Sequence, residues 1–373
     1  MWRLVAASAG LLIAACAPSS SISPTAAPSP FGTSATPAAE VSVPAGIESW
    51  SWSPDGSYLL LVSGGIEVLD TRGQSAATAD GVIATWVDAQ HFATWSPGAP
   101  GLIGGTVAIR GLDGSTIPVP GTYQGRGLIG DGAGALALMP ASADGLTAPE
   151  RFVVWTNGVL GASAPGSPFG WSPDGSQLIV AAGPPLTGTA GSPASVPIAL
   201  LTRPFTATAQ PINGVHVNPN YIPAFDQPGS EVAFQCAAVG ALGGCHQLVL
   251  DLSNDEAQDV AAQPPGVPLT WLPNGDLLLA ANDAAGAGEL REWNGTSLVQ
   301  TALPHASWGL AAASGALALV SEAADGTTST QIIGPSGASV ASSPGSALSW
   351  SPDGSFIAIR GDSGDELMIL TVR

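Results

Sequence analysis

Lysine is absent from the 373 residues, and charge of either sign is scarce. Charged residues make up 10% of the chain, and the nine basic residues are all arginines. With 28 acidic residues, the formal net charge is −19. Nucleic acids and anionic lipid headgroups are bound through clusters of basic side chains, so this balance argues against both as partners.

Long hydrophobic runs are also missing, because no segment offers the roughly 20 apolar residues that span a bilayer. At the N-terminus, Arg3 precedes a shorter uncharged run from Leu4 to Ala15, as in a secretory signal peptide. The run closes on Ile-Ala-Ala-Cys, which resembles a bacterial lipobox. We therefore expect a signal peptide over 1–15 and a lipid on Cys16 as the only membrane anchor of an extracytoplasmic protein. An ordinary signal peptide with a chance cysteine is the alternative.

Charged and large apolar side chains are nearly absent from the next segment, residues 17–42, which are rich in Ser, Pro, Ala and Thr. Such a segment buries too little apolar surface to offset the entropy lost on ordering. We predict that residues 16–42 are a disordered, lipid-anchored linker and that residues 43–373 form the folded domain.

Cysteine is equally scarce, since only Cys236 and Cys245 follow Cys16. The two flank a Gly-rich stretch in FQCAAVGALGGCHQL. In an exported protein such a pair predicts a disulfide that closes a loop. A metal site that includes the adjacent His246 is the alternative, although no fourth ligand is evident.

What the chain does contain is a repeat. WSPDGS occurs at 52–57, 171–176 and 350–355, and an imperfect copy, WLPNGD, occurs at 271–276. Proline presets φ, aspartate can hydrogen-bond nearby backbone, and glycine takes the left-handed position, so Ser-Pro-Asp-Gly predicts a tight turn. An apolar run such as YLLLV follows each WSPDGS, and the motif therefore predicts a β-hairpin.

Weaker copies fill the intervals and bring the spacing to 34–54 residues. A period near 40–45 residues with four short strands per unit indicates a β-propeller, whereas stacked β-sandwiches give no reason for it. We expect an all-β fold of about eight four-stranded blades, or seven if the copy at Ile129 is false. One anchor residue per copy would fill the wedge between blades. The predicted anchors are Trp52, Trp86, Ile129, Trp171, Phe225, Trp271, Trp308 and Trp350.

The WSPDGS motif followed by an apolar strand resembles the WD-repeat-like units of TolB-type β-propellers, over residues 46–373. The resemblance implies a propeller fold and a protein partner. A second domain usually precedes the propeller in that family, and here only the linker does. Because of this departure, the resemblance does not imply that the chain has the specific role of TolB.

The last unit stops one strand short, after ELMILTV at 366–372. A segment around residues 41–43 could supply the missing strand and close the ring, which would remove both free sheet edges.

Strand alternation predicts that the SPDG turns lie on one face of the ring and the longer connections on the other. Irregular loops on a rigid scaffold carry function, so we expect binding on the long-loop face. Its loops are 96–105, 140–150, 182–197, 236–245 and 360–365. The candidate binding residues on this face are Arg151, His216, Tyr221, His246, His305 and Arg360. The alternative is that they are scattered polar loop residues without a role in binding.

Two motifs resemble a catalytic or a metal-binding segment, but each lacks other residues that the function requires. GDSGD at 361–365 resembles the nucleophile segment of chymotrypsin-like proteases, but the chain lacks that family's histidine context, and we predict a hairpin turn. DLSNDEAQD at 251–259 lacks the glycine and closing glutamate of a calcium loop, and we predict a turn between strands.

These observations favour a non-catalytic binding or scaffolding module at the bacterial cell envelope. We expect a monomer whose partner is another envelope protein or a polymer, with no cofactor, metal or catalytic residue. A propeller enzyme with its site at the central channel mouth, of lyase, glycosidase or cofactor-dependent dehydrogenase type, is the alternative. It requires carboxylates or histidines that converge on the channel.

Overall fold

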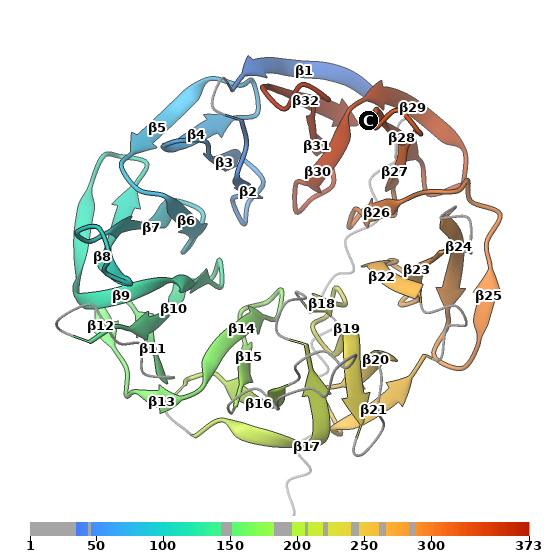
Figure 1. Cartoon of the computed structure of the whole chain (residues 1–373). Helices are drawn as coiled ribbons and strands as arrows, with labels where there is room; N and C mark the ends of the chain where they lie inside the picture. Colours follow the sequence, from blue (N-terminus) through green and yellow to red (C-terminus); the bar gives the residue numbers. More distant parts are fainter. Residues whose placement is uncertain are drawn as a thin grey trace, which may run out of the picture.

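The computed structural model describes residues 35–43, 46–142, 151–182, 196–205, 208–218, 223–239, 246–260, 266–282 and 288–372. These residues form only strands and turns, arranged as a ring of antiparallel sheets (Figure 1). In this part of the chain no helix is long and apolar enough to cross a membrane. Residues 1–34, Tyr221 and Cys245 lie outside it. The prediction of an all-β propeller is confirmed.

Four sheets of the described chain have four strands each, and their neighbouring strands are consecutive in the chain except where β1 pairs with β32. The first three are β2 (Ser49–Trp52), β3 (Tyr58–Val62), β4 (Ile66–Asp70) and β5 (Ser75–Ala79); β22 (Gly266–Trp271), β23 (Leu277–Asn282), β24 (Gly288–Trp293) and β25 (Leu298–Gln300); and β26 (Trp308–Ala311), β27 (Leu317–Glu322), β28 (Thr328–Ile333) and β29 (Ser339–Pro344). The fourth contains β30 (Ser346–Trp350), β31 (Phe356–Arg360), β32 (Glu366–Val372) and β1 (Ala35–Ser42).

Two larger sheets each combine two such units. In one, the long strand β9 pairs with β8 on one side and with β10 on the other. Its strands are β6 (Ile83–Trp86), β7 (His91–Pro97), β8 (Gly104–Gly111), β9 (Thr116–Gly130), β10 (Ala135–Pro140), β11 (Arg151–Thr156), β12 (Val159–Leu160) and β13 (Ala164–Pro165).

In the other, β17 pairs with β19 across the boundary. Its strands are β14 (Ser167–Trp171), β15 (Gln177–Ala181), β16 (Val196–Thr202), β17 (Gln210–Val217), β18 (Ala224–Phe225), β19 (Glu231–Val239), β20 (His246–Asp251) and β21 (Glu256–Asp259). Division at β9 and at the β17–β19 pair gives eight units around the ring, and we interpret these units as blades.

The core lies between neighbouring units. Leu59 and Leu61 of β3 pack with Leu348 and Ile369 of the last unit, whereas Leu60 of β3 joins a cluster with the second unit. Successive strand residues thus enter different cores because their side chains point to opposite faces of the sheet. This two-sided burial explains why the second strands are nearly continuous apolar runs.

The WSPDGS motif builds its turn as predicted. In the first copy the buried hydroxyl of Ser53 donates to Asp55 Oδ1 (2.6 Å) and accepts the N–H of Tyr58 (3.0 Å). Gly56 has a φ of +72° and donates its N–H to the carbonyl of Ser53 (2.9 Å). The same serine–aspartate bond, also 2.6 Å, recurs at Ser172 and Ser351.

Tryptophan anchors also hydrogen-bond to the preceding unit. The indole of Trp171 donates to the carbonyl of Ile129 (3.0 Å), and that of Trp350 to Leu310 (3.0 Å). Wherever the bond occurs, the acceptor directly precedes the last residue of the innermost strand, as Ser51 does when it accepts from Trp86 (3.0 Å).

This regularity corrects two of the predicted anchors. Trp308 is the first residue of β26, and Ala311 is the last, so the anchor position of that unit is Ala311. Similarly, Gly130 rather than Ile129 ends β9. The prediction placed the anchors at large side chains, but the position of the turn determines which residue ends the strand. Trp52, Trp86, Trp171, Phe225, Trp271 and Trp350 each end their strand.

The ring closes through β1, which pairs with β32 from Ala35 opposite Val372 to Ser42 opposite Glu366. The predicted closing segment at 41–43 is therefore the end of a longer strand. This strand corrects the linker boundary, because residues 35–42 belong to the propeller. Paired main-chain groups and partly buried alanines offset the ordering entropy that made the segment look disordered.

Candidate binding face

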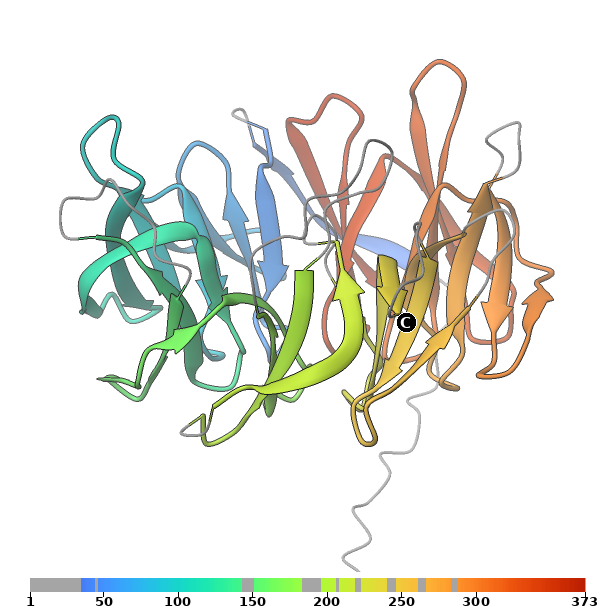
Figure 2. The same ribbon diagram turned by 60° about the horizontal axis from the view of Figure 1, so that its bottom comes forward.

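Strand direction divides the connections between two faces of the ring, whose upper and lower edges Figure 2 shows from the side. The turn face carries the first-to-second turns, such as 53–57, and the third-to-fourth turns, such as 71–74. The long-loop face carries the second-to-third connections, such as 361–365, and the links between units, such as 301–307.

All five described candidate binding residues lie at the long-loop face. Arg151 begins β11, His246 begins β20, Arg360 ends β31, and His216 lies near the end of β17. His305 lies in the link before β26. The predicted sidedness therefore agrees with the strand directions.

The structure does not bring these residues together. They come from five different units, and in the described chain no hydrogen bond or ion pair joins any two of them. His246 pairs instead with Asp259 (Nδ1–Oδ2, 2.8 Å). Arg151 donates to the hydroxyl and carbonyl of Ser163 (2.9 and 2.8 Å), within its own unit. The local partner of Arg151 and the ion pair of His246 account for both without a ligand.

His216 and His246 flank the same strand but point apart. His216 lies opposite Ala238, and His246 lies opposite Ala237. Since adjacent residues of a strand point to opposite faces, the two imidazoles lie on opposite sides of the sheet. Within the described residues no group of three or more His, Cys, Asp or Glu side chains could hold a metal ion.

The innermost strands of the ring carry almost no charge. The innermost strands, which Figure 1 shows nearest the axis, read SWSW, IATW, SPFGW, AF, GVPLTW, WGLA and SALSW, and the inner part of β9, which pairs with β10, reads YQGRGLIG. None contains an acid or a histidine, and the exposed Arg126 of β9 is the one charged residue among these described strands. The carboxylates or histidines that an enzyme at the channel requires are therefore missing from the innermost strands.

Carboxylates nearest the axis on the turn face serve the turns. The hydroxyl of Ser172 and the N–H of Ser176 donate to Asp174 (2.6 and 3.0 Å), and these bonds lower the pKa of Asp174 below its usual value. An aspartate held ionised inside its own turn is poorly suited to general acid–base work near neutral pH.

An inter-unit ion pair fixes one of the turns that have no tryptophan anchor. The Asp131 carboxylate, whose side chain is fully buried, pairs with Arg203 and accepts the N–H groups of Ala133 and Ala135, both at 2.7 Å. Arg203 also lies over the ring of Phe205, 4.9 Å from its centroid. Burial nonetheless raises the pKa of Asp131.

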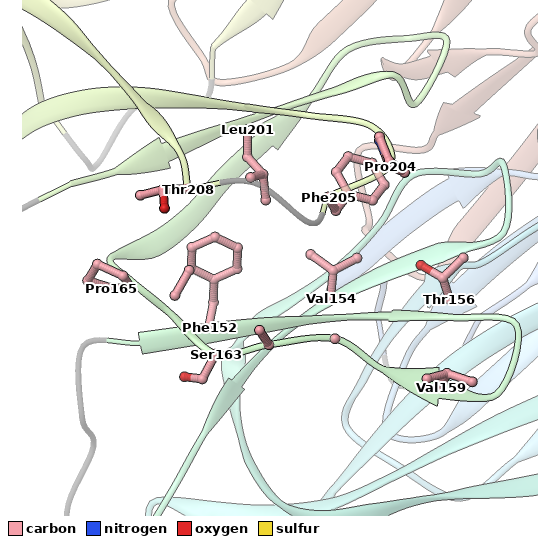
Figure 3. A pocket seen from close by; sticks show the side chains of 13 residues that line it. Phe152, Val154, Thr156, Val159, Ser163, Pro165, Leu201, Pro204, Phe205 and Thr208 are labelled. Atoms are coloured by element: carbon pink, nitrogen blue, oxygen red, sulfur yellow. The ribbon is translucent and has the colours of Figure 1, made fainter.

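A cavity of about 390 Å³ lies at the outer rim beside this ion pair. Figure 3 shows Phe152 and Val154 pointing from β11 toward Leu201 and Phe205 of the next unit. Its walls are mostly apolar, and Thr156, Ser163 and Thr208 supply hydroxyls. This cavity could not be predicted from the sequence, since its two walls are about 50 residues apart in the chain.

A larger cavity, of about 650 Å³, lies where the closing sheet meets the unit before it. We call it the closing groove. Apolar residues and four carboxylate residues line it, without any basic side chain. Its lining residues are Glu40, Val41, Ser42, Pro344, Ile359, Gly361, Asp362, Ser363, Asp365, Glu366, Leu367 and Met368.

The two motifs that suggested catalysis or metal binding are turns, as predicted. GDSGD joins β31 to β32, and Gly364 donates its N–H to the carbonyl of Gly361 (3.0 Å). In the second motif the hydroxyl of Ser253 donates to Asp251 (2.6 Å) in the turn between β20 and β21.

The fold defines a β-propeller whose innermost strands carry no carboxylate or histidine, and comparisons with solved structures agree on the fold. BamB from Moraxella catarrhalis has a TM-score of 0.51 at 9% identity, over 90% of this chain and 99% of that one. An oligogalacturonate lyase from Vibrio parahaemolyticus also has a TM-score of 0.51, at 10% identity, over 90% and 92%.

A structure assigned to TolB from Agrobacterium tumefaciens has a TM-score of 0.39 at 14% identity, over 90% of this chain and 96% of that one. No protein-family model matches the chain, and no curated protein matches its sequence. At these identities the likeness defines the β-propeller fold alone.

Proposed function

We propose that this chain is an exported, lipid-anchored propeller that acts as a non-catalytic binding or scaffolding module at the bacterial cell envelope. A contrast between two surfaces carries the proposal. The innermost strands carry no carboxylate or histidine, whereas the long-loop face carries varied connections and a groove with four carboxylate residues. This distribution fits a protein that binds a partner on its long-loop face better than an enzyme with its site at the centre of the ring.

The direction of β1 supports the same face. Ala35 lies opposite Val372, at the turn face, and the strand runs from there to the long-loop face. A tether from Cys16 would thus join the ring on its turn face, which leaves the long-loop face free to meet a partner. Over about 19 residues such a tether spans at most roughly 60 Å if extended.

Crosslinking in intact cells tests the proposal. A photoreactive amino acid at position 363 would report on the long-loop face, and one at position 256 would report on the turn face. We expect one dominant envelope protein to crosslink from 363 and not from 256. Equal capture at both positions, or no capture from 363 by correctly folded protein, would contradict the proposal.

The anchor and the disulfide are tested separately. Cys16→Ser should move the chain from the membrane to the soluble fraction, because the lipid is proposed as its only anchor. Thiol labelling without reductant should leave Cys236 and Cys245 unmodified if they are bonded. Retention of Cys16→Ser at the membrane, or labelling of either cysteine, contradicts the respective proposal.

A propeller enzyme remains the second candidate only because a lyase shares the fold. Turnover of acidic polysaccharides by the purified chain would support it, and it would require catalytic groups outside the innermost strands.

A further inference from the structure

The closing groove is built on one face of the closing sheet. Met368 of β32 lies opposite Glu40 of β1 and Ile359 of β31, and Glu366 lies opposite Ser42. Cross-strand partners, and residues two apart on one strand, share a face of the sheet. The register therefore sets the side chains of Glu40 and Glu366 beside an apolar floor.

The opposite wall comes from the preceding unit and from the hairpin at 361–365. Pro344 ends β29 and lines the groove. Asp362 accepts the N–H of Thr328 (2.9 Å) and its hydroxyl (2.5 Å), which ties the hairpin to that unit. These two bonds lower the pKa of Asp362, so its carboxylate is ionised at neutral pH.

Among the described residues that line the groove, none is basic. Arg360 follows Ile359 in β31, so strand alternation directs its guanidinium to the other face of the sheet. The lining residues include no Arg, Lys or His. Net negative charge is thereby concentrated around an apolar cavity of about 650 Å³.

We infer that the closing groove binds a basic segment of the protein partner, with an arginine or lysine stem over Met368 and Pro344 and its charged head at the rim carboxylates. This inference rests on the proposed function, since it names the chemistry of the partner. Long basic side chains bury their aliphatic stems on apolar surface while the charge stays in water. Charge-assisted hydrogen bonds to carboxylates then orient the head.

The apolar floor favours a peptide over a small cation. A hydrated metal ion would gain from the carboxylates but little from Met368 and Pro344. A metal ion also prefers a cage of several convergent oxygens, and among the described residues no such group of acidic side chains occurs.

Fluorescence anisotropy on the detergent-purified full chain tests the inference. The probe is a labelled eight-residue peptide of alternating Arg and Ala, with a Glu-for-Arg peptide as the negative control. Asp365→Asn with Glu366→Gln removes two rim charges. Asp255→Asn with Glu256→Gln removes the same charge from an exposed turn on the opposite face. Circular dichroism confirms that each variant folds.

We expect the groove variant to bind the peptide about fivefold more weakly, the effect of two exposed charge pairs, and the turn variant to bind as wild type. Equal weakening in both variants would mean attraction by net charge alone and would overturn the inference. Displacement of the peptide by spermine or Ca²⁺ at lower concentrations than by unlabelled peptide would also overturn it.

The crosslinking experiment keeps the two proposals separate. If a partner is captured from position 363 and the groove variant captures it equally well, the inference fails while the proposed function stands. If peptide binding depends on the groove but no envelope partner is captured, the proposed function fails and the groove's specificity for basic peptides stands.

Discussion

The indole of Trp52 donates its N–H to the main-chain carbonyl of Ser349 (3.3 Å), and so joins the first repeat to the last. Its neighbour Trp50 makes a similar bond to Leu348 (3.1 Å). The same type of bond that connects consecutive units thus also closes the ring. Closure depends on these bonds and on β1, which together connect residues about 300 positions apart.

Replacement of Trp52 by Phe should separate the hydrogen bond from the packing. Phe keeps most of the buried ring but loses the N–H, so we expect the free energy of unfolding to fall by about 1–2 kcal/mol. Trp52→Ala should cost about 3–5 kcal/mol, because it also removes the apolar contacts. Urea unfolding measures both. Trp308→Phe is the control, since Trp308 lies outside the anchor register, and a loss as large as that of Trp52→Phe would contradict the role of the bond.

Gly130 provides a test of the corrected register. A Cβ built there would lie 1.8 Å from the carbonyl oxygen of Trp86, and backbone cannot yield as a side-chain tip can. Gly130→Ala should therefore lower the free energy of unfolding by about 3 kcal/mol or more. Gly65→Ala is the matched control because no atom lies within 4 Å of its Cβ position. Similar urea midpoints for the two variants would refute this close approach.

Much of the fold follows from local chemistry that the sequence displays. Ser53, Pro54, Asp55 and Gly56 each have one role in a four-residue turn, so the hairpins and the period could be predicted. The anchor positions at Ala311 and Gly130 could not be predicted, because these residues have no indole and a different hydrogen bond connects their units to the preceding ones. There the main-chain N–H groups of Ala311 and Gly130 donate to threonine hydroxyls of the preceding units (3.1 and 3.2 Å).

The candidate site was harder to predict than the fold. The side of the ring followed from strand alternation, but the closing groove depends on the pairing of Glu40 with Met368, from opposite ends of the chain. Residues 35–42 have the composition of a linker, and only the pairing with β32 makes them a strand. Tertiary partners of this kind leave no local signal.

Arg203→Met should show how far a buried carboxylate depends on its cation. Asp131 would remain buried with only its two N–H donors, and we expect a loss of about 1–3 kcal/mol, moderated because Arg203 is partly exposed. The pKa of Asp131 is already raised by burial. The folded state thus favours the protonated acid, and stability is lost as pH rises through the folded-state pKa. The destabilisation by Arg203→Met should therefore be larger at pH 7 than at pH 4.

A double-mutant cycle with Asp131→Asn provides the control for this pair. The asparagine has no charge to leave unpaired, so Arg203→Met should cost much less in that background. A cost that is independent of both pH and the Asp131 substitution would assign the effect of Arg203 to its contact with Phe205.

Acid should weaken the propeller through its turn aspartates. Hydrogen bonds from Ser172 and Ser176 lower the pKa of Asp174. Burial raises the pKa of Asp353, but the bonds from Ser351 and Ser355 outweigh it, and the net shift is downward. A carboxylate with a lowered folded-state pKa contributes stability above its unfolded value, near 3.9, and that contribution disappears as pH falls through the folded value.

We therefore expect the urea midpoint to fall as the pH drops below the unfolded-state value of these aspartates, near 3.9. Asp174→Asn combined with Asp353→Asn should lower the midpoint at pH 7 and reduce the fall on acidification. Asp255→Asn with Glu256→Gln removes the same charge outside the WSPDGS turns and should keep the wild-type fall. If both double variants lost the acid dependence equally, net charge rather than the serine–aspartate bonds would set the acid stability of the ring.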